Sequence, residues 1–275
     1  MNYKIFLVTL LILLNSVLSA DDKIYYAVTY KRTNILASIE LNGFPIGISS
    51  KEPFASGQAN ANIWILPKEN KLNIKVTELI KGKGVFDSKL EVRIYLTKEG
   101  QFPDEGKKLL EIIIPESADE KLTIPFEKEY EFNPEIIPPS DLWENAANTD
   151  LTEEDKKEIR NVMTKLHKAL NSGNIEEILK LIEFKEKDFA KAMYVNPEES
   201  LQDNKKMLKS FSKEIKGKLE PIPKDLKFKS IANGLIVEVT DSKNKEPIRA
   251  SSKNKGSFSF PIYVSKMNEK WILVR

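Results

Sequence analysis

Alternating apolar and polar residues characterise the first half of the chain. Apolar side chains recur at every second position over residues 24–30 and again over 35–41. A period of two places successive side chains on opposite faces of a strand, so each run predicts a β-strand with one buried face. Asn42-Gly43 follows, and the alternation resumes over 44–48. Because both central residues of a tight hairpin turn need positive φ, this Asn-Gly pair predicts a hairpin.

The same strand signals continue as far as Phe132. A turn over residues 67–70 separates a short apolar run from a second alternating one, and later runs are separated by Gly- and Pro-containing turns. We expect strands at 63–66, 72–76, 90–96, 109–114 and 122–132, with a polar loop at 56–62. Several short strands joined by turns, without a helical period, predict an all-β sandwich.

The pattern changes after Phe132. Residues 133–139 hold three prolines, which favours a stiff, extended spacer. Ser140-Asp141 can then begin a short helix that carries Leu142 and Trp143. We therefore expect a Pro-rich linker with a short helix over residues 134–150.

From Leu151 the apolar period becomes 3.6, which predicts amphipathic helices. Thr152 and Asp155 approximate a capping box, and Gly173 is a stop signal. Asn174 and Asn196-Pro197 are start signals for two further helices. We then expect about four strands, at 226–230, 235–239, 258–264 and 271–274, with a weaker strand signal at 247–251 and an Asn233-Gly234 hairpin turn.

These patterns predict two domains. A β-sandwich domain over 21–133 precedes the linker, and an α+β domain over 151–275 packs its helices on a curved antiparallel sheet. Residues 1–20 have the features of a secretory signal peptide: a charge at Lys4, an apolar run at 5–14 and small residues before a cut near Ala20. Cleavage after Ser19 and retention as an uncleaved anchor are the alternatives.

Cleavage would leave a chain without an integral membrane segment, so we expect a periplasmic or secreted protein. The chain has no cysteine, so it has no residue to carry a lipoprotein lipid, and disulfides and thiol chemistry are excluded. Absence of disulfides in an exported protein favours a bacterial source. The net charge is +2 with 31% charged residues of both signs, which gives no support to nucleic acid as a partner.

Two family resemblances follow from these segments. Leu41-Asn42-Gly43, residues 63–66 and Asn70-x-Leu72-x-Ile74 resemble the galactose-binding-like jelly-roll modules found in many glycosidases, although Glu69 replaces the usual glycine. The resemblance implies sugar binding, while these residues are framework in that family. Residues 152–275 are similar to the nuclear transport factor two-like, cystatin-like α+β cone fold, whose members include isomerases and binding modules. The whole chain also resembles uncharacterised exported bacterial proteins.

Candidate chemistry is sparse. His167 could act as a general base, but its position at the border of the apolar stripe equally suits a partly solvated residue. Asp150, residues 153–155 and similar acidic clusters at expected helix starts would favour the helix dipole without any catalytic role. We therefore predict no catalytic residue, no metal site and no cofactor.

Asn60, Asn62 and Trp64 are the candidate ligand-binding residues, because amides and an indole ring suit sugar recognition. The asparagines could instead be turn residues, and Trp64 and Trp271 could be core residues. We predict an exported non-catalytic binding or structural accessory protein of the bacterial envelope, with a glycan or another envelope protein as ligand. The alternative is a small-molecule-binding protein or a hydrolase- or isomerase-type enzyme with a carboxylate-based site in the C-terminal cone. The oligomeric state stays open.

Overall fold

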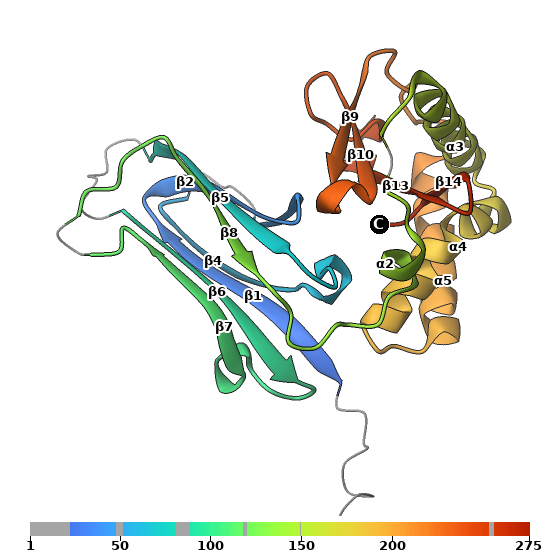
Figure 1. Ribbon diagram of the computed structural model, residues 1–275. Coiled ribbons are helices and arrows are strands. Elements are labelled where there is room, and N and C mark those ends of the chain that lie inside the picture. The colour runs from blue at the N-terminus through green and yellow to red at the C-terminus, as the bar shows by residue number, and fades with distance from the viewer. Residues whose placement is uncertain (1–22, 48–51, 81–87, 118–119, 149, 253–255) are drawn as a thin grey trace, which may run out of the picture.

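The computed structural model describes residues 23–275 apart from 48–51, 81–87, 118–119, 149 and 253–255 (Figure 1). Within these residues the protein is mostly β-sheet, with antiparallel strands in four sheets and four α-helices in the second half of the chain. The expected signal peptide at 1–20 lies outside the described residues.

Two four-stranded sheets form the N-terminal part. Their strand orders are β4-β1-β6-β7 and β3-β2-β5-β8. The strands are β1 (Ile24–Thr33), β2 (Ile35–Leu41), β3 (Phe44–Gly47), β4 (Phe54–Asn60), β5 (Asn70–Leu79), β6 (Lys89–Lys98), β7 (Lys107–Ile114) and β8 (Phe126–Phe132). The Asn42-Gly43 hairpin between β2 and β3 is confirmed, with φ of 54° and 88° at the two turn residues.

The two N-terminal sheets share one apolar core. The alternation predicted for the strands is present, because inward residues are buried while their neighbours are at least partly exposed. Val28 and Ile94 from one sheet and Leu72 and Ile74 from the other are completely buried in a single cluster. Burial of a large aliphatic side chain contributes about 1.5–3 kcal/mol, so these alternating positions supply much of the stability of this part.

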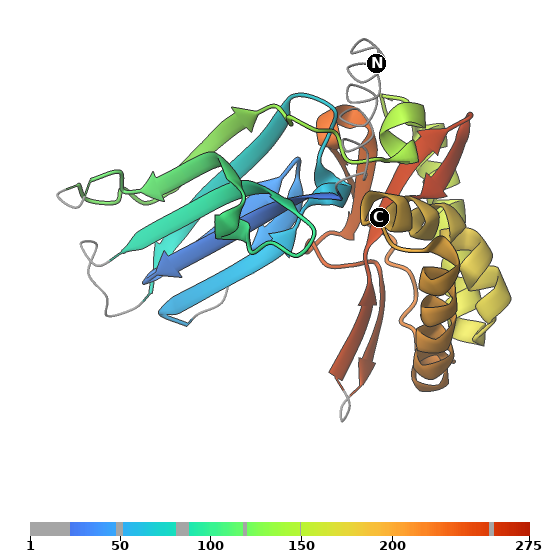
Figure 2. The same ribbon diagram turned by 90° about the horizontal axis from the view of Figure 1, so that it is seen from below.

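The C-terminal part combines helices with two further sheets. The helices are α2 (Asp141–Asn145), α3 (Glu153–Ser172), α4 (Ile175–Ala192) and α5 (Pro197–Ile215). Strands β9 (Leu226–Ile231), β10 (Ile236–Asp241), β13 (Ile262–Met267) and β14 (Lys270–Leu273) form a sheet of order β14-β13-β10-β9. Strands β11 (Ile248–Ser252) and β12 (Gly256–Phe260) form a separate hairpin (Figure 2).

Local signals placed the helices well. Thr152 and Asp155 form a reciprocal capping box at the start of α3, and Gly173 ends that helix with a φ of 72°. Asn174 and Asn196 accept backbone hydrogen bonds at the starts of α4 and α5. These side chains satisfy amide groups that a helix terminus leaves without a partner.

The expected order of loop and strand before β5 was wrong. The polar loop predicted at 56–62 is mostly strand β4, and the strand predicted at 63–66 begins as a 3-10 turn over Asn62–Trp64. Small polar residues can form an edge strand because the neighbouring strand β1 satisfies half of their backbone groups. Ile65 and Leu66 are buried by tertiary packing without forming a strand.

Two predictions for the C-terminal strands also need correction. The strand expected at 258–264 is divided by Pro261 into β12 and β13, which belong to different sheets. Together with β11, which forms at the weaker signal over 247–251, this division gives six strands in place of the predicted four. Proline has no N–H to donate to a ladder, which explains the break. The Asn233-Gly234 turn is longer than predicted, because Ile231 pairs with Ile236 across four intervening residues.

A third apolar cluster contains residues from both parts of the chain. It includes Phe44 and Leu66 from the N-terminal part and Ile231, Tyr263 and Val274 from the C-terminal part. The division into domains at 21–133, 134–150 and 151–275 stays a prediction.

Asp155 ties the start of α3 to the last hairpin. Its carboxylate accepts hydrogen bonds from the hydroxyl and amide of Thr152, and it accepts the indole N–H of Trp271 at 2.9 Å and lies 3.1 Å from Lys266 Nζ. The donors from Thr152 are the main cause of a pKa far below the usual range of an aspartate, assisted by Trp271 and Lys266.

This arrangement predicts acid sensitivity. A carboxyl with a depressed pKa in the folded state stabilises the fold above its unfolded pKa of about 4, and this stabilisation is lost progressively as the pH falls below that value. We expect Asp155→Asn to lower the free energy of unfolding at pH 7 by about 2 kcal/mol. Urea unfolding at pH 7 and pH 3 should show a smaller pH dependence for Asp155→Asn than for the wild type. The exposed-site variant Asp225→Asn should keep the wild-type dependence, and an equal loss in both variants would contradict this role.

Candidate functional site

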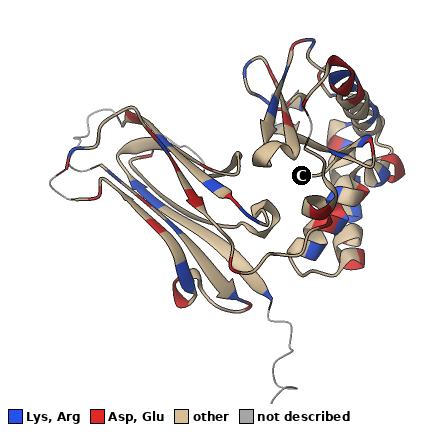
Figure 3. Cartoon of the chain, viewed as in Figure 1, with Lys and Arg blue, Asp and Glu red and all other residues tan. Residues whose placement is uncertain are grey.

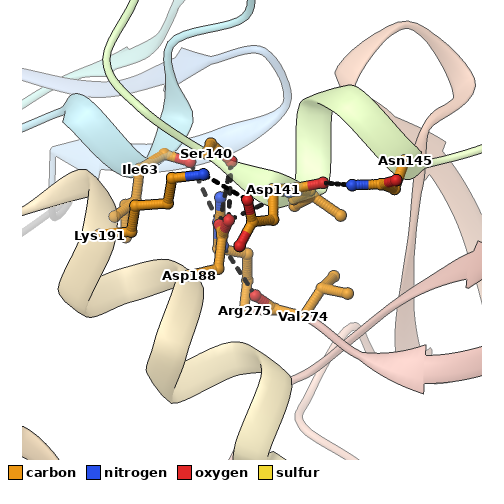
Figure 4. Close-up of polar contacts among 9 residues, drawn as sticks. Ile63, Ser140, Asp141, Asn145, Asp188, Lys191, Val274 and Arg275 are labelled. Carbon is orange, nitrogen blue, oxygen red and sulfur yellow. Dashed lines mark hydrogen bonds and ion pairs between the residues drawn. The ribbon is translucent and has the colours of Figure 1, made fainter. Parts of the chain in front are cut away.

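Arg275, which follows β14, joins the two parts of the chain in a buried position. Its Nη1 donates to Asp188 Oδ2 on α4 at 2.7 Å, and its Nε donates to the carbonyl of Ile63 at 3.0 Å (Figure 4). The side chains of Arg275 and Asp188 are 2% and 0% exposed. A buried charge needs a paired partner with good geometry, and this pair lies where both parts meet.

The Asp188 carboxylate also fixes the chain before α2. It accepts hydrogen bonds from Ser140 Oγ and from the amide of Leu142, each at 3.0 Å. The Arg275 guanidinium lies 5.6 Å from the Trp64 ring and 5.3 Å from the Trp143 ring, distances suited to cation–π attraction. Burial lowers the pKa of Arg275 while Asp188 opposes that change. One ion pair therefore connects the 3-10 turn at Asn62–Trp64, α2, α4 and Arg275.

The two Asn-Gly turns of the sequence lie against each other. The amide of Ala232 donates to the carbonyl of Asn42 at 2.9 Å. Gly43 has a φ of 88°, and a Cβ there would lie 2.7 Å from Ile231 Cγ2. Only glycine permits both this backbone conformation and this close approach. The turn between β2 and β3 is thus a docking point for the end of β9.

Buried asparagines support the N-terminal side of this contact. Asn42 Nδ2 donates to Asn70 Oδ1 at 2.8 Å and to the carbonyl of Trp64 at 2.7 Å. Asn42 Oδ1 accepts the amide of Lys71, and Asn70 Oδ1 also accepts the amide of Leu66, both at 2.8 Å. Because these backbone groups have no strand partner, the amide side chains replace the missing ladder.

A polar groove of about 460 Å³ lies beside the contact between the two turns. Its floor is the outward face of β2, β5 and β8, and its wall is the end of β9 with the turn after it. The lining includes three lysines and three glutamates, so its formal charge balances: Lys71, Lys75, Lys229, Glu40, Glu127 and Glu129. Figure 3 shows the same mixture of signs over the rest of the molecule.

These charges pair with one another across strands. Lys71 lies 2.9 Å from Glu129, and this carboxylate is the main cause of a raised Lys71 pKa. The pairs Lys75–Glu127 and Lys229–Glu40 measure 3.2 and 3.5 Å, and the latter connects the two sides of the groove. Such exposed pairs contribute little to stability, about 0–1 kcal/mol each. Their groups can therefore be recruited by a ligand at small cost.

Asn73 projects a neutral amide from the floor of the groove. Its side chain is half-buried and has no hydrogen-bond partner among the residues that the structure describes. An amide offers two donor hydrogens and an acceptor oxygen. Asn73 is therefore available to orient a polar ligand.

The structure places the predicted ligand-binding residues near the same junction but in different surroundings. Asn62 is completely buried, and its amide bonds to the amide of Tyr26 and to the carbonyls of Ile24 and Ala192 at 2.7–2.9 Å. Trp64 is half-buried and stacks on Phe44 with ring centroids 3.8 Å apart.

Asn60 alone of the three is well exposed. It lines a pocket of about 300 Å³ together with Tyr25, Gln58 and Gln101. None of the three predicted residues lines the groove beside the turns. Their ligand-binding role stays a prediction.

His167 is half-buried on α3, where its Nε2 lies 2.8 Å from the carbonyl of Glu220. This bond agrees with a structural role at the border of the apolar stripe. Trp271 is buried, as a core residue would be. Between the helices and the strands, Phe258, Phe260 and Ile262 pack in one apolar cluster.

We expect the Arg275–Asp188 pair to control stability. Arg275→Ala would leave the Asp188 carboxylate buried without its counter-ion, which costs about 3–5 kcal/mol. Urea unfolding followed by tryptophan fluorescence measures the effect, because Trp64 and Trp143 flank the guanidinium. A double-mutant cycle with Asp188→Asn isolates the pair, and a coupling energy near zero would contradict this assignment. Lys191→Ala, which removes the exposed partner of Asp141, is the control and should change stability by less than about 1 kcal/mol.

Within its described residues the protein has no group of three or more His, Cys, Asp or Glu side chains arranged to hold a metal ion. Across the same ranges, every helix is too short or too polar to cross a bilayer. Comparison of the chain with known protein families, with curated proteins and with solved structures finds no match.

Proposed function

We propose that this protein is an exported, non-catalytic, two-domain binding protein of the bacterial envelope. We further propose that the groove beside the two Asn-Gly turns binds a glycan. The observation that supports this proposal is the groove itself: a concave polar surface formed jointly by both parts of the chain and held by a buried contact. A rigid, preformed surface avoids much of the ordering cost of binding.

The chemistry of the lining favours a neutral polyhydroxylated ligand. Sugar hydroxyls both donate and accept hydrogen bonds, and the groove offers ammonium donors, carboxylate acceptors and the amide of Asn73. Its balanced charge gives no net attraction to an anion or a cation. A volume of about 460 Å³ falls in the usual range of small-molecule sites, about 300–1,000 Å³.

The affinity for a glycan should depend on Asn73 and Lys75, and it should change little with salt concentration. We expect Asn73→Ala and Lys75→Ala each to weaken glycan binding about tenfold, the effect of losing one useful hydrogen bond. A glycan array would identify the sugar, and titration calorimetry would then compare the variants. The matched control is Thr77→Ala, an exposed residue on the same strand outside the groove lining. Affinity for a neutral glycan should change less than threefold between about 0.05 and 0.5 M salt, because screening acts on charged pairs.

Two results would contradict the groove assignment. One is an array without signal at high protein concentration together with silent calorimetry. The other is a glycan whose affinity is unchanged in both groove variants while their circular dichroism matches the wild type. A ligand that dissociates as salt rises would point to a charged molecule in place of a neutral glycan.

A further inference from the structure

The free edge of strand β4 differs from the other sheet edges of the N-terminal part. β4 ends its sheet, so β1 is its one strand neighbour among the described residues. Its seven residues, FASGQAN, include neither a charged residue nor a proline. Charges and proline are the usual features that prevent an exposed edge from pairing with another strand.

The other edge strands of the N-terminal part show those protective features. β3 is four residues long and contains Pro45. β7 carries Lys107, Lys108 and Glu111, and β8 has four charged residues in seven. The lack of charge at β4 therefore distinguishes it from the other edge strands of the N-terminal part and does not reflect a chain with few charges.

Hydrogen bonds at both ends of β4 show which backbone groups face away from β1. The amide of Ala61 donates to the carbonyl of Tyr26, and the amide of Asn34 donates to the carbonyl of Pro53. Residues bonded to the neighbouring strand alternate along an antiparallel ladder, and the register pairs Tyr30 with Gly57. Positions 55, 57 and 59 thus bond to β1. Phe54, Ser56, Gln58 and Asn60 direct their amide and carbonyl groups toward the free edge.

We propose that β4 pairs antiparallel with β4 of a second copy of this chain, in a register centred on Gly57. In this register Ser56 lies opposite Gln58 of the second copy, and Phe54 lies opposite Asn60. All four outward-directed residues then find partners, which gives about eight hydrogen bonds between the chains. The two-fold axis lies between the Gly57 residues of the two copies and makes the contact self-complementary, as a symmetric dimer requires.

Side chains on both faces of the strand are compatible with this pairing. The inward positions Ala55, Gly57 and Ala59 are small, and a Cβ at Gly57 would lie 2.5–2.6 Å from the Tyr30 ring. On the outer face, Lys31 lies beside Ser56 on its own chain, so the two copies of Lys31 stay separated by both β4 strands. Phe54, 60% exposed, would be covered in part by the partner strand.

A single pair of seven-residue strands gives a modest interface. It buries less than the roughly 1,600 Å² of a standard stable interface. We therefore expect a dimer with a dissociation constant between about 1 and 500 µM. Charged residues introduced on the outer face should weaken it without disturbing the bonds to β1.

Sedimentation equilibrium of the purified protein over about 1–500 µM tests the pairing. We expect the double variant Ser56→Lys with Gln58→Lys to raise the dimer dissociation constant at least tenfold, because lysines of opposite copies would face each other. The control Gln202→Lys with Ser210→Lys adds the same charge at exposed positions of α5 and should leave the constant unchanged. Circular dichroism establishes that both variants are folded.

The register has its own test, because the chain has no cysteine. A mixture of Ser56→Cys and Gln58→Cys proteins should form disulfide-linked dimers at least fivefold faster than either variant alone. Three results would overturn the proposal: a monomer throughout the concentration range, a dimer unaffected by the two lysines, or equal cross-linking in the mixture and the single variants. A monomer that captures unrelated extended peptides at β4 would instead make this edge a site for another protein's strand.

Discussion

The buried ion pair between Arg275 and Asp188 is the constraint on which the arrangement of the molecule depends. Replacing such a pair by apolar residues is often neutral or stabilising, so its value for net stability is small, but breaking it is costly. Here it also fixes geometry, because the same two side chains hold the Ile63 carbonyl, Ser140 and the start of α2. An apolar contact could slide, whereas directional hydrogen bonds permit one arrangement. The pair thus links Ile63 of the N-terminal part to α2 and α4 of the C-terminal part.

The contact between the Asn-Gly turns extends this constraint to the surface. Gly43 allows Ile231 to approach the β2–β3 turn, and the Ala232–Asn42 hydrogen bond fixes the register of the approach. Behind the turn, the side chains of Asn42 and Asn70 hydrogen-bond to each other. Asn42 also hydrogen-bonds to the carbonyl of Trp64 and the amide of Lys71. A polar network of this kind is favourable only when its members are satisfied together. The groove is therefore rigid at the edge where both parts meet.

Sequence patterns predicted the elements whose causes are local. The Asn42-Gly43 hairpin and the helix starts at Thr152, Asn174 and Asn196 each depend on residues within one turn. Features that depend on distant partners were missed. β4 lacks an apolar stripe and is a strand because β1 pairs with it, whereas 63–66 has the apolar character of a strand but is held by asparagine side chains. The sequence could not predict the groove lining for the same reason. The outward residues of β5 line a groove only because the end of β9, distant in the sequence, packs beside them.

The two proposed surfaces are compatible because they belong to different sheets. The groove floor lies on the outer face of β2, β5 and β8, whereas β4 is the edge of the sheet that contains β1. Pairing through β4 would leave both grooves open and hold them at a fixed separation in one particle. Envelope glycans repeat the same unit many times, so two weak sites on one rigid dimer could bind such a polymer about 100-fold or more tightly than one site alone. A polar groove that relies on a few hydrogen bonds gains most from this arrangement, since its single-site affinity is limited by competition with water.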